Sequence, residues 1–179
     1  MTETAHERPK RVTLFGAEST GKTTLLDQLG RHFDAVVVPE YGRTYTEEHG
    51  QTASTAADML NIARGHLQLR RAAEREADRL VIEDTDPVLT AIWSDILAGY
   101  RDPWFDRFDD YPDLYLLCDI DLPWVRDSVR YFGDREARLR FHTACERELI
   151  ARQVSFVRIS GTAEQRLAKA IDAVETLLR

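Results

Sequence analysis

The sequence contains little lysine and little cysteine. Lysine occurs only as Lys10, Lys22 and Lys169, so nearly all of the 24 cationic side chains are arginine. The two cysteines, Cys118 and Cys145, are too few for a disulfide scaffold or a zinc site. Cys118 lies in an apolar run, which is typical of a buried thiol. We therefore expect neither a disulfide framework nor a cysteine-bound metal.

The chain also lacks a surplus of basic residues and a long apolar run. Its 31 acidic and 24 basic residues give a formal net charge of −7 over 179 residues. Proteins that bind the phosphate backbone of nucleic acids need a dense cationic surface, so we expect no nucleic acid partner. The first ten residues contain no apolar core of a signal peptide, and no run approaches membrane-spanning length. We expect a cytoplasmic protein with no membrane partner.

What the chain does contain is an alternation of short apolar runs and longer helical segments. The apolar runs are "RVTLF", "AVVVPE", "RLVIED", "LYLLCD" and "SFVRIS". Continuous apolar strands that alternate with helices are typical of a parallel sheet covered on both faces. The sequence therefore predicts an α/β fold, a three-layer αβα sandwich around a five-stranded parallel sheet. We expect residues 1–10 to be a flexible N-terminus and residues 11–179 to form a single domain.

Two helix starts carry the signature of a capping box. Thr55 is followed three residues later by Asp58, and Thr162 by Gln165. In this arrangement each side chain bonds to the backbone N–H of the other residue. Helices are therefore predicted to begin directly after Thr55 and Thr162.

The segment "GAESTGKT" joins the first predicted strand to a leucine-rich helix. It matches the pattern G-x-x-x-x-G-K-[ST] of a phosphate-binding loop, the P-loop. Its glycines let the backbone fold around a phosphate, and the loop amides with the helix start hold the phosphate oxygens. Lys22 is expected to reach the β- and γ-phosphates, and the Thr23 hydroxyl to ligate Mg²⁺. The residues predicted to bind ATP are Gly16, Ala17, Glu18, Ser19, Thr20, Gly21, Lys22, Thr23 and Thr24.

Three acidic residues end the third predicted strand, in "LVIEDTD". Asp84 stands where a second Mg²⁺ anchor, the Walker B carboxylate, is expected in P-loop proteins. We therefore predict a metal site at Thr23 and Asp84, with Asp84 also catalytic. Asp84 or Asp86 could instead cap the helix that begins at Pro87, and that alternative stays open.

A P-loop alone does not distinguish a switch, a motor and a kinase. GTPases read guanine through an Asn-Lys-x-Asp loop, but the single asparagine, Asn61, is not part of one. Motor ATPases of the AAA type usually end the Walker B strand in Asp-Glu, whereas this chain has the order Glu83-Asp84-Thr85. A small P-loop chain with five strands therefore fits a P-loop kinase that acts on a small molecule.

An arginine-rich segment, "DLPWVRDSVRYFGDREARLR", follows the fourth predicted strand. Arg126 and Arg130 are four residues apart, so on a helix they face the same way. We predict that both are catalytic, as part of a lid that stabilises the charge of the transferring phosphoryl group. A solvated charged helix is the alternative.

The second predicted strand ends in "VVVPEYGRTY". Glu40 would emerge at the carboxyl edge of the sheet, where substrates of such folds bind. A carboxylate there can accept the proton of an attacking hydroxyl. Arg43 could hold a phosphate or orient Glu40, and Tyr41 and Tyr45 could stack on a flat ring. The alternative is a turn residue beside surface aromatics.

Six motifs occur in order along the chain: "GAESTGKTTL", "PEYGRTY", "IARGHLQ", "DTDPVLTA", "DLYLLCDIDLPWVRDSVR" and "FVRISG". In this set the chain resembles the ribosylnicotinamide kinase domain of the bacterial NAD-salvage proteins. The resemblance implies ATP- and Mg²⁺-dependent phosphorylation of the 5′-hydroxyl of nicotinamide riboside, which gives nicotinamide mononucleotide. It also implies that Glu40, Arg43 and Asp86 line the riboside site. We expect His66 to have a structural or supporting role.

The chain departs from that family at two points. Pro39 stands where members carry a tryptophan against the nicotinamide ring, so Trp93 and Trp124 are the candidates to replace it. The chain also carries no adenylyltransferase or repressor domain, so we expect it to leave the next step to another enzyme. Two alternatives remain, namely a kinase of another nucleoside or vitamin alcohol, and an ATPase regulator with a protein partner. The aromatic segment 99–113 could form an interface patch for such a partner, although we expect it to fold back as a lid or as a cover of the core.

Overall fold

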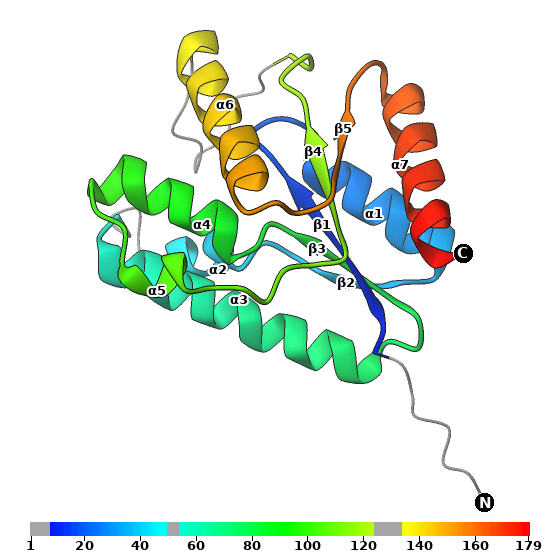
Figure 1. Cartoon of the computed structure of the whole chain (residues 1–179), viewed down its shortest axis with the longest axis horizontal. Coiled ribbons are helices and arrows are strands. Elements are labelled where there is room, and N and C mark those ends of the chain that lie inside the picture. The colour runs from blue at the N-terminus through cyan, green and yellow to red at the C-terminus, as the bar shows by residue number, and fades with distance from the viewer. Residues whose placement is uncertain (1–7, 50–53, 124–133) are drawn as a thin grey trace, which may run out of the picture.

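The computed structural model describes residues 8–49, 54–123 and 134–179. Its elements, in chain order, are β1 (Lys10–Phe15), α1 (Lys22–Phe33), β2 (Val36–Val38), α2 (Tyr41–His49), α3 (Ala56–Glu76), β3 (Leu80–Asp84), α4 (Pro87–Trp93), the π-helical turn η1 (Ser94–Ala98), α5 (Pro103–Asp106), β4 (Leu114–Cys118), α6 (Arg135–Ala151), β5 (Phe156–Ile159) and α7 (Ala163–Leu178) (Figure 1). Every predicted strand is present. The short helix α5 lies in the aromatic segment 99–113.

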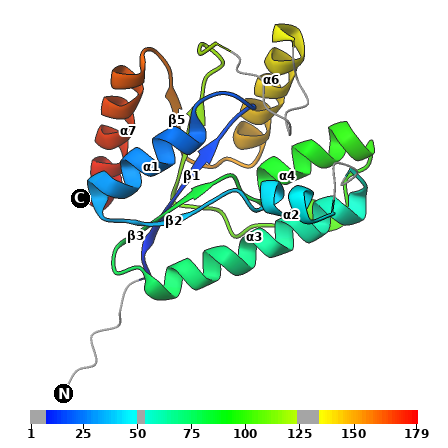
Figure 2. The ribbon, with the colours of Figure 1, turned by 180° about the vertical axis from the view of Figure 1, so that it is seen from behind.

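The sheet is five-stranded and wholly parallel, in the order β2-β3-β1-β4-β5. Helices α1 and α7 cover one face, while α3, α4 and α6 cover the other (Figures 1 and 2). The predicted three-layer sandwich is therefore confirmed. The predicted lid residues Arg126 and Arg130 lie outside the described residues.

The apolar runs form strands that are buried on both faces. In β1, Val12 and Leu14 pack with α1 and α7, while Phe15 packs with α4 and α6. The second run differs from the expectation of a buried strand, because β2 lies at the edge of the described sheet, where it pairs with β3. Its Val37 side chain is 39% exposed.

Contacts with the rest of the domain begin within residues 1–10, which we expected to be a flexible N-terminus. β1 starts at Lys10, and the Arg8 guanidinium forms two 2.9 Å hydrogen bonds to the Asp113 carboxylate. Both predicted capping boxes are confirmed, at Thr55 with Asp58 and at Thr162 with Gln165.

Part of the aromatic segment 99–113 covers the core, although Tyr100 is 54% exposed. Phe105 and Phe108 are 1% and 8% exposed. Arg152, at the end of α6, donates hydrogen bonds to the carbonyl oxygens of both residues at 3.1 Å, and to the Tyr111 hydroxyl at 2.9 Å. This guanidinium joins the segment to α6, and the expected role as a cover of the core is confirmed for Phe105 and Phe108.

Replacement of Arg152 by methionine is expected to lower the free energy of unfolding by about 2 kcal/mol, because several hydrogen bonds to a charged group are lost together. Urea unfolding measures this loss. The exposed Arg147 on the same helix supplies the control, since Arg147→Met should change stability little. An equal loss in both variants would contradict the anchoring role of Arg152.

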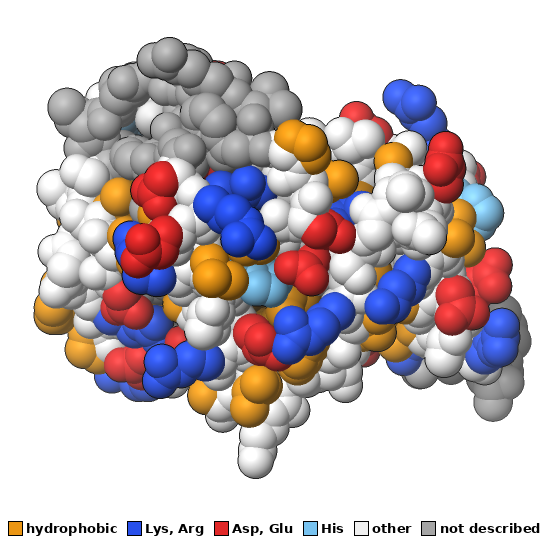
Figure 3. Space-filling model, turned by 90° about the horizontal axis from the view of Figure 1, so that it is seen from above, with side chains coloured by type: hydrophobic (Ala, Val, Ile, Leu, Met, Phe, Trp, Pro, Cys, Tyr) orange, Lys and Arg blue, Asp and Glu red, His pale blue; other side chains and the backbone are white. Residues whose placement is uncertain are grey.

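On the face seen in Figure 3, described acidic and basic side chains are interspersed, with apolar side chains scattered among them. Among the described residues, no helix is both long enough and apolar enough to cross a membrane.

Candidate active site

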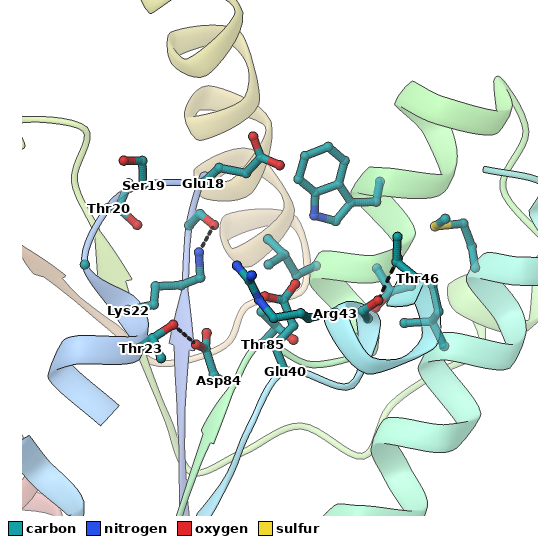
Figure 4. A pocket seen from close by; sticks show the side chains of 18 of the residues that line it. Glu18, Ser19, Thr20, Lys22, Thr23, Glu40, Arg43, Thr46, Asp84 and Thr85 are labelled. Carbon is teal, nitrogen blue, oxygen red and sulfur yellow. Dashed lines mark hydrogen bonds between the residues drawn. The ribbon is translucent and has the colours of Figure 1, made fainter. Parts of the chain in front are cut away.

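A cavity of about 200 Å³ opens where the carboxyl ends of β1 and β3 meet the start of α1 (Figure 4). Its walls come from the P-loop, the end of β3, and helices α2, α3, α4 and η1. The lining residues are Gly16, Glu18, Ser19, Thr20, Gly21, Lys22, Thr23, Thr24, Glu40, Gly42, Arg43, Thr46, Met59, Ile62, Asp84, Thr85, Leu89, Thr90, Trp93 and Leu97. The structure thus brings eight of the nine predicted P-loop residues together with Glu40, Arg43, Asp84 and Trp93. The ninth, Ala17, is fully buried.

The P-loop backbone has the conformation that a phosphate cradle needs. Gly16 and Gly21 have φ angles of 132° and 77°, which L side chains rarely adopt. A Cβ at Gly16 would lie 2.7 Å from the Cys118 carbonyl oxygen. The N-cap residue of α1 is Gly21, which has no side chain to cap the helix, so the first amides of α1 can donate to an anion.

Lys22 lies over this loop. Its Nζ donates hydrogen bonds to the carbonyl oxygens of Gly16 at 3.1 Å and Ala17 at 2.9 Å (Figure 4). The ammonium group is therefore held beside the loop amides, in a position suited to a bound polyphosphate.

Thr23 and Asp84 also lie together. The Thr23 hydroxyl donates to Asp84 Oδ2 at 2.9 Å, while Asp84 Oδ1 is buried and has no hydrogen-bond partner in the described part of the chain. Mg²⁺ usually takes one or two protein oxygens together with phosphates and waters. An unpaired carboxylate oxygen beside a hydroxyl fits that donor set. No group of three or more His, Cys, Asp or Glu residues suited to a metal occurs in the described residues.

Glu40 faces the P-loop from the junction between β2 and α2, next to Arg43 (Figure 4). Burial raises the pKa of Glu40, and the negative charge of Asp84 raises it further. The positive charges of Lys22 and Arg43 oppose this rise. A glutamate with a raised pKa holds a transferred proton more readily than an exposed one does.

A buried polar network lies behind the end of β3. Glu83 is fully buried; it accepts a hydrogen bond from the Thr13 hydroxyl at 2.7 Å and lies 2.9 Å from His66 Nε2. Burial alone raises the pKa of Glu83, but the hydrogen bond and charge of His66, with help from Arg70 and Thr13, lower it overall. His66 is 2% exposed and does not line the cavity, which agrees with the supporting role we expected. The sequence analysis did not predict that Thr13 belongs to this network, although a polar residue within an apolar strand could have indicated a buried hydrogen bond.

Asp86 has a different position from the predicted riboside contact. Its side chain is fully buried and caps α4, accepting the N–H groups of Val88 at 3.0 Å and Leu89 at 3.1 Å. Its other oxygen accepts the Tyr115 hydroxyl at 2.5 Å. Burial and the charge of Glu83 raise the pKa of Asp86 to about 6, although the Tyr115 hydrogen bond opposes the rise. The capping alternative is therefore the one that the structure supports.

The predicted stacking residues Tyr41 and Tyr45 do not line the cavity. The Tyr45 side chain is 7% exposed and donates a hydrogen bond to Asp58 at 2.9 Å, while the Tyr41 ring packs against Gly65. Trp93 does line the cavity, and its ring centroid lies 4.4 Å from that of Phe141. Trp124 lies outside the described residues.

Several cavity residues were not predicted from the sequence. Met59, Ile62 and Leu97 form apolar wall together with Trp93. They lie on α3 and η1, and their spacing is that of ordinary core positions. No local signal separated them from residues that only pack.

A protein family described as "AAA domain" matches residues 11–166. The chain belongs to this family. Over 175 residues, this AAA domain is 29% identical to the trifunctional NAD biosynthesis/regulator protein NadR of Escherichia coli (strain K12), covering 94% of this chain and 43% of NadR. NadR of Salmonella typhimurium (strain LT2) matches with the same identity and coverage. The chain therefore spans less than half the length of these curated relatives.

Solved structures show the same fold. A crystal structure of NadR in complex with NR superposes with a TM-score of 0.78 at 24% identity, covering 97% of this chain and 52% of that one. A thymidylate kinase from Ehrlichia chaffeensis superposes with a TM-score of 0.68 at 16% identity, covering 96% of this chain and all of that one. The resemblance inferred from the sequence motifs is confirmed, as is the P-loop kinase fold.

Proposed function

We propose that this AAA domain, over residues 11–179, transfers the γ-phosphoryl group of ATP to the 5′-hydroxyl of nicotinamide riboside, giving nicotinamide mononucleotide. The observation that carries this proposal is the geometry of one cavity. A P-loop with Lys22, Thr23 and Asp84 forms one wall, and Glu40 with Arg43 faces it across a space large enough for a small molecule. The similarity to NadR, solved in complex with NR, supports the choice of acceptor.

In this proposal Mg²⁺-bound ATP supplies the activated phosphoryl group. Thr23 and Asp84 would hold the metal, and Lys22 with the loop amides would hold the phosphates and offset their negative charge. Glu40 would orient the hydroxyl of the riboside and accept its proton. Arg43, beside it, would hold Glu40 or an incoming phosphate in place, and Arg126 and Arg130 remain proposed lid residues.

The acceptor would lie against the apolar wall made by Met59, Ile62, Trp93 and Leu97. The nicotinamide ring of the riboside is flat and carries a positive charge, and an indole attracts such a ring through its electron-rich face. Trp93 is therefore the candidate for the platform that Pro39 cannot supply. Tyr41, Tyr45 and Asp86 are not needed for this arrangement.

The purified protein should form ADP in a saturable manner when nicotinamide riboside is added to ATP and Mg²⁺. Thymidine, cytidine and a vitamin alcohol serve as competing acceptors in the same assay, and the Lys22→Ala protein controls for contaminating ATPases. A clear preference for one of the other alcohols would reassign the acceptor within the kinase class. ATP turnover that no alcohol stimulates would overturn the kinase proposal.

A further inference from the structure

The outer side of the P-loop is held by two arginines that do not line the cavity. On α6, Arg138 Nη2 donates to the Ser19 carbonyl oxygen at 3.3 Å. On α7, Arg166 Nη2 donates to the Thr20 carbonyl oxygen at 2.6 Å. Both residues are 4% exposed. Two consecutive carbonyl groups of the loop therefore each receive a hydrogen bond from a buried guanidinium.

The two arginines occupy equivalent places in their helices. Each is the fourth residue of a helix whose first turn is fixed by a side-chain cap, from Asp134 in α6 and from Thr162 in α7. A capped first turn has a defined direction, so the guanidinium four residues in has a defined position. The two contacts are thus built into the starts of α6 and α7.

The loop that follows β4 completes this arrangement. Arg166 Nη1 donates to Asp121 Oδ1 at 2.6 Å, and Asp121 Oδ2 accepts the Gly161 N–H at 2.5 Å. Arg138 also donates to the Leu122 carbonyl oxygen at 3.4 Å. Both arginines therefore join the P-loop to the 121–122 segment, and Arg166 has a carboxylate that fixes its orientation.

These contacts act on the same peptide groups that face the cavity. The Ser19 carbonyl shares a peptide unit with the Thr20 N–H, and the Thr20 carbonyl shares one with the Gly21 N–H. A cationic donor on a carbonyl oxygen polarises the peptide and makes its N–H a stronger donor.

We propose that Arg138 and Arg166 are positioning residues that set the affinity of the P-loop for a polyphosphate from its outer side. This inference rests on the proposed binding of nucleotide but not on the identity of the acceptor. It predicts an effect that grows with the number of phosphates on the ligand, because the polarised amides contact phosphate oxygens and not the base.

The test compares Arg166→Met with wild-type protein by titration calorimetry, using ATP, ADP and adenosine with Mg²⁺. Methionine keeps the unbranched apolar stem and removes the donors. We expect ATP to bind about 10- to 100-fold more weakly, ADP to lose less, and adenosine to be unchanged. In steady-state assays the KM for ATP should rise while kcat at saturating ATP changes little. Arg166→Lys should restore part of the affinity, since it keeps the charge and one contact.

Arg70→Met is the matched control. Arg70 is fully buried and ion-paired with Asp110, but it does not line the cavity or contact the P-loop. The Arg70→Met substitution should lower the thermal midpoint of unfolding and leave the affinity for nucleotide unchanged. If Arg166→Met does not fold, Arg138→Met and Arg166→Lys take its place. Both should bind ATP more weakly than wild type, by a smaller factor than the one expected for Arg166→Met.

Folded Arg166 and Arg138 variants that bind ATP within twofold of wild type would overturn the inference. An equal loss of ATP affinity in Arg70→Met would also overturn it, because the effect would then be general loosening of the fold. If the wild-type protein bound no ATP, the proposed function itself would be contradicted, and the inference that rests on it would fail as well.

Discussion

Glu40→Gln is expected to lower kcat by about 10²- to 10⁴-fold, because the amide cannot take the proton of the attacking hydroxyl. Glutamine keeps the size and the hydrogen-bonding oxygen of glutamate, so binding of the acceptor should change much less than turnover. Steady-state kinetics with acceptor varied at saturating ATP separates the two effects. Glu47→Gln, at an exposed position on helix α2, which begins directly after Glu40, is the matched control and should leave kcat unchanged.

The pH dependence of the wild-type enzyme gives a second measure of the same residue. Burial and the charge of Asp84 raise the pKa of Glu40 above the usual value of about 4.3. The ionised base is present only above that raised pKa, so kcat/KM should fall as the pH drops through it, at a higher pH than for an exposed glutamate. The residual activity of Glu40→Gln should lack this acid limb.

A Glu40→Gln protein with wild-type kcat would show that Glu40 only binds the acceptor. Asp84 would then be the carboxylate to test next, since it is 1% exposed and has an oxygen without a hydrogen-bond partner in the described residues.

Lys22→Ala is expected to lower kcat by about 10²- to 10³-fold while the protein stays folded. Among the described residues, its Nζ donates hydrogen bonds to the carbonyl oxygens of Gly16 and Ala17, and its side chain is half-buried and outside the apolar core. The loss should therefore lie in the stabilisation of developing phosphate charge and not in folding. Circular dichroism and the thermal midpoint check the fold, and ADP formation checks turnover.

Lys169→Ala, on the exposed side of α7, provides a charge-matched control that should keep full activity. If Lys22→Ala retained turnover within tenfold of wild type, the P-loop would not be acting on the transferred group. A Lys22→Ala protein that failed to fold would contradict the placement of Lys22 outside the core.

Features encoded in a short stretch of chain could be predicted well. The P-loop is eight contiguous residues whose glycines and helix start define its backbone, so the pattern from Gly16 to Thr23 was sufficient. The capping boxes at Thr55 and Thr162 depend on residues only three apart. The parallel sheet followed from apolar runs that alternate with helices.

The role of Asp86 could not be predicted from the local sequence pattern. Its position beside Asp84 allowed both a riboside contact and a helix cap, and the sequence could not choose between them. The choice depends on Tyr115, whose hydroxyl reaches Asp86 from a different strand, 29 residues away. Tyr45 was misjudged for the same reason, because its burial depends on the packing of α2 against α3.

The amino-acid sequence alone predicted the P-loop, the αβα architecture and the candidate catalytic residues next to the strand ends, because each of these shows as a pattern of neighbouring residues along the chain. Tertiary structure alone decided which side chains share the cavity, that β2 is an edge strand, and that Arg166 lies against the Thr20 carbonyl from 146 residues away. Contacts between distant segments depend on how helices pack on the sheet, and local sequence patterns do not encode that packing.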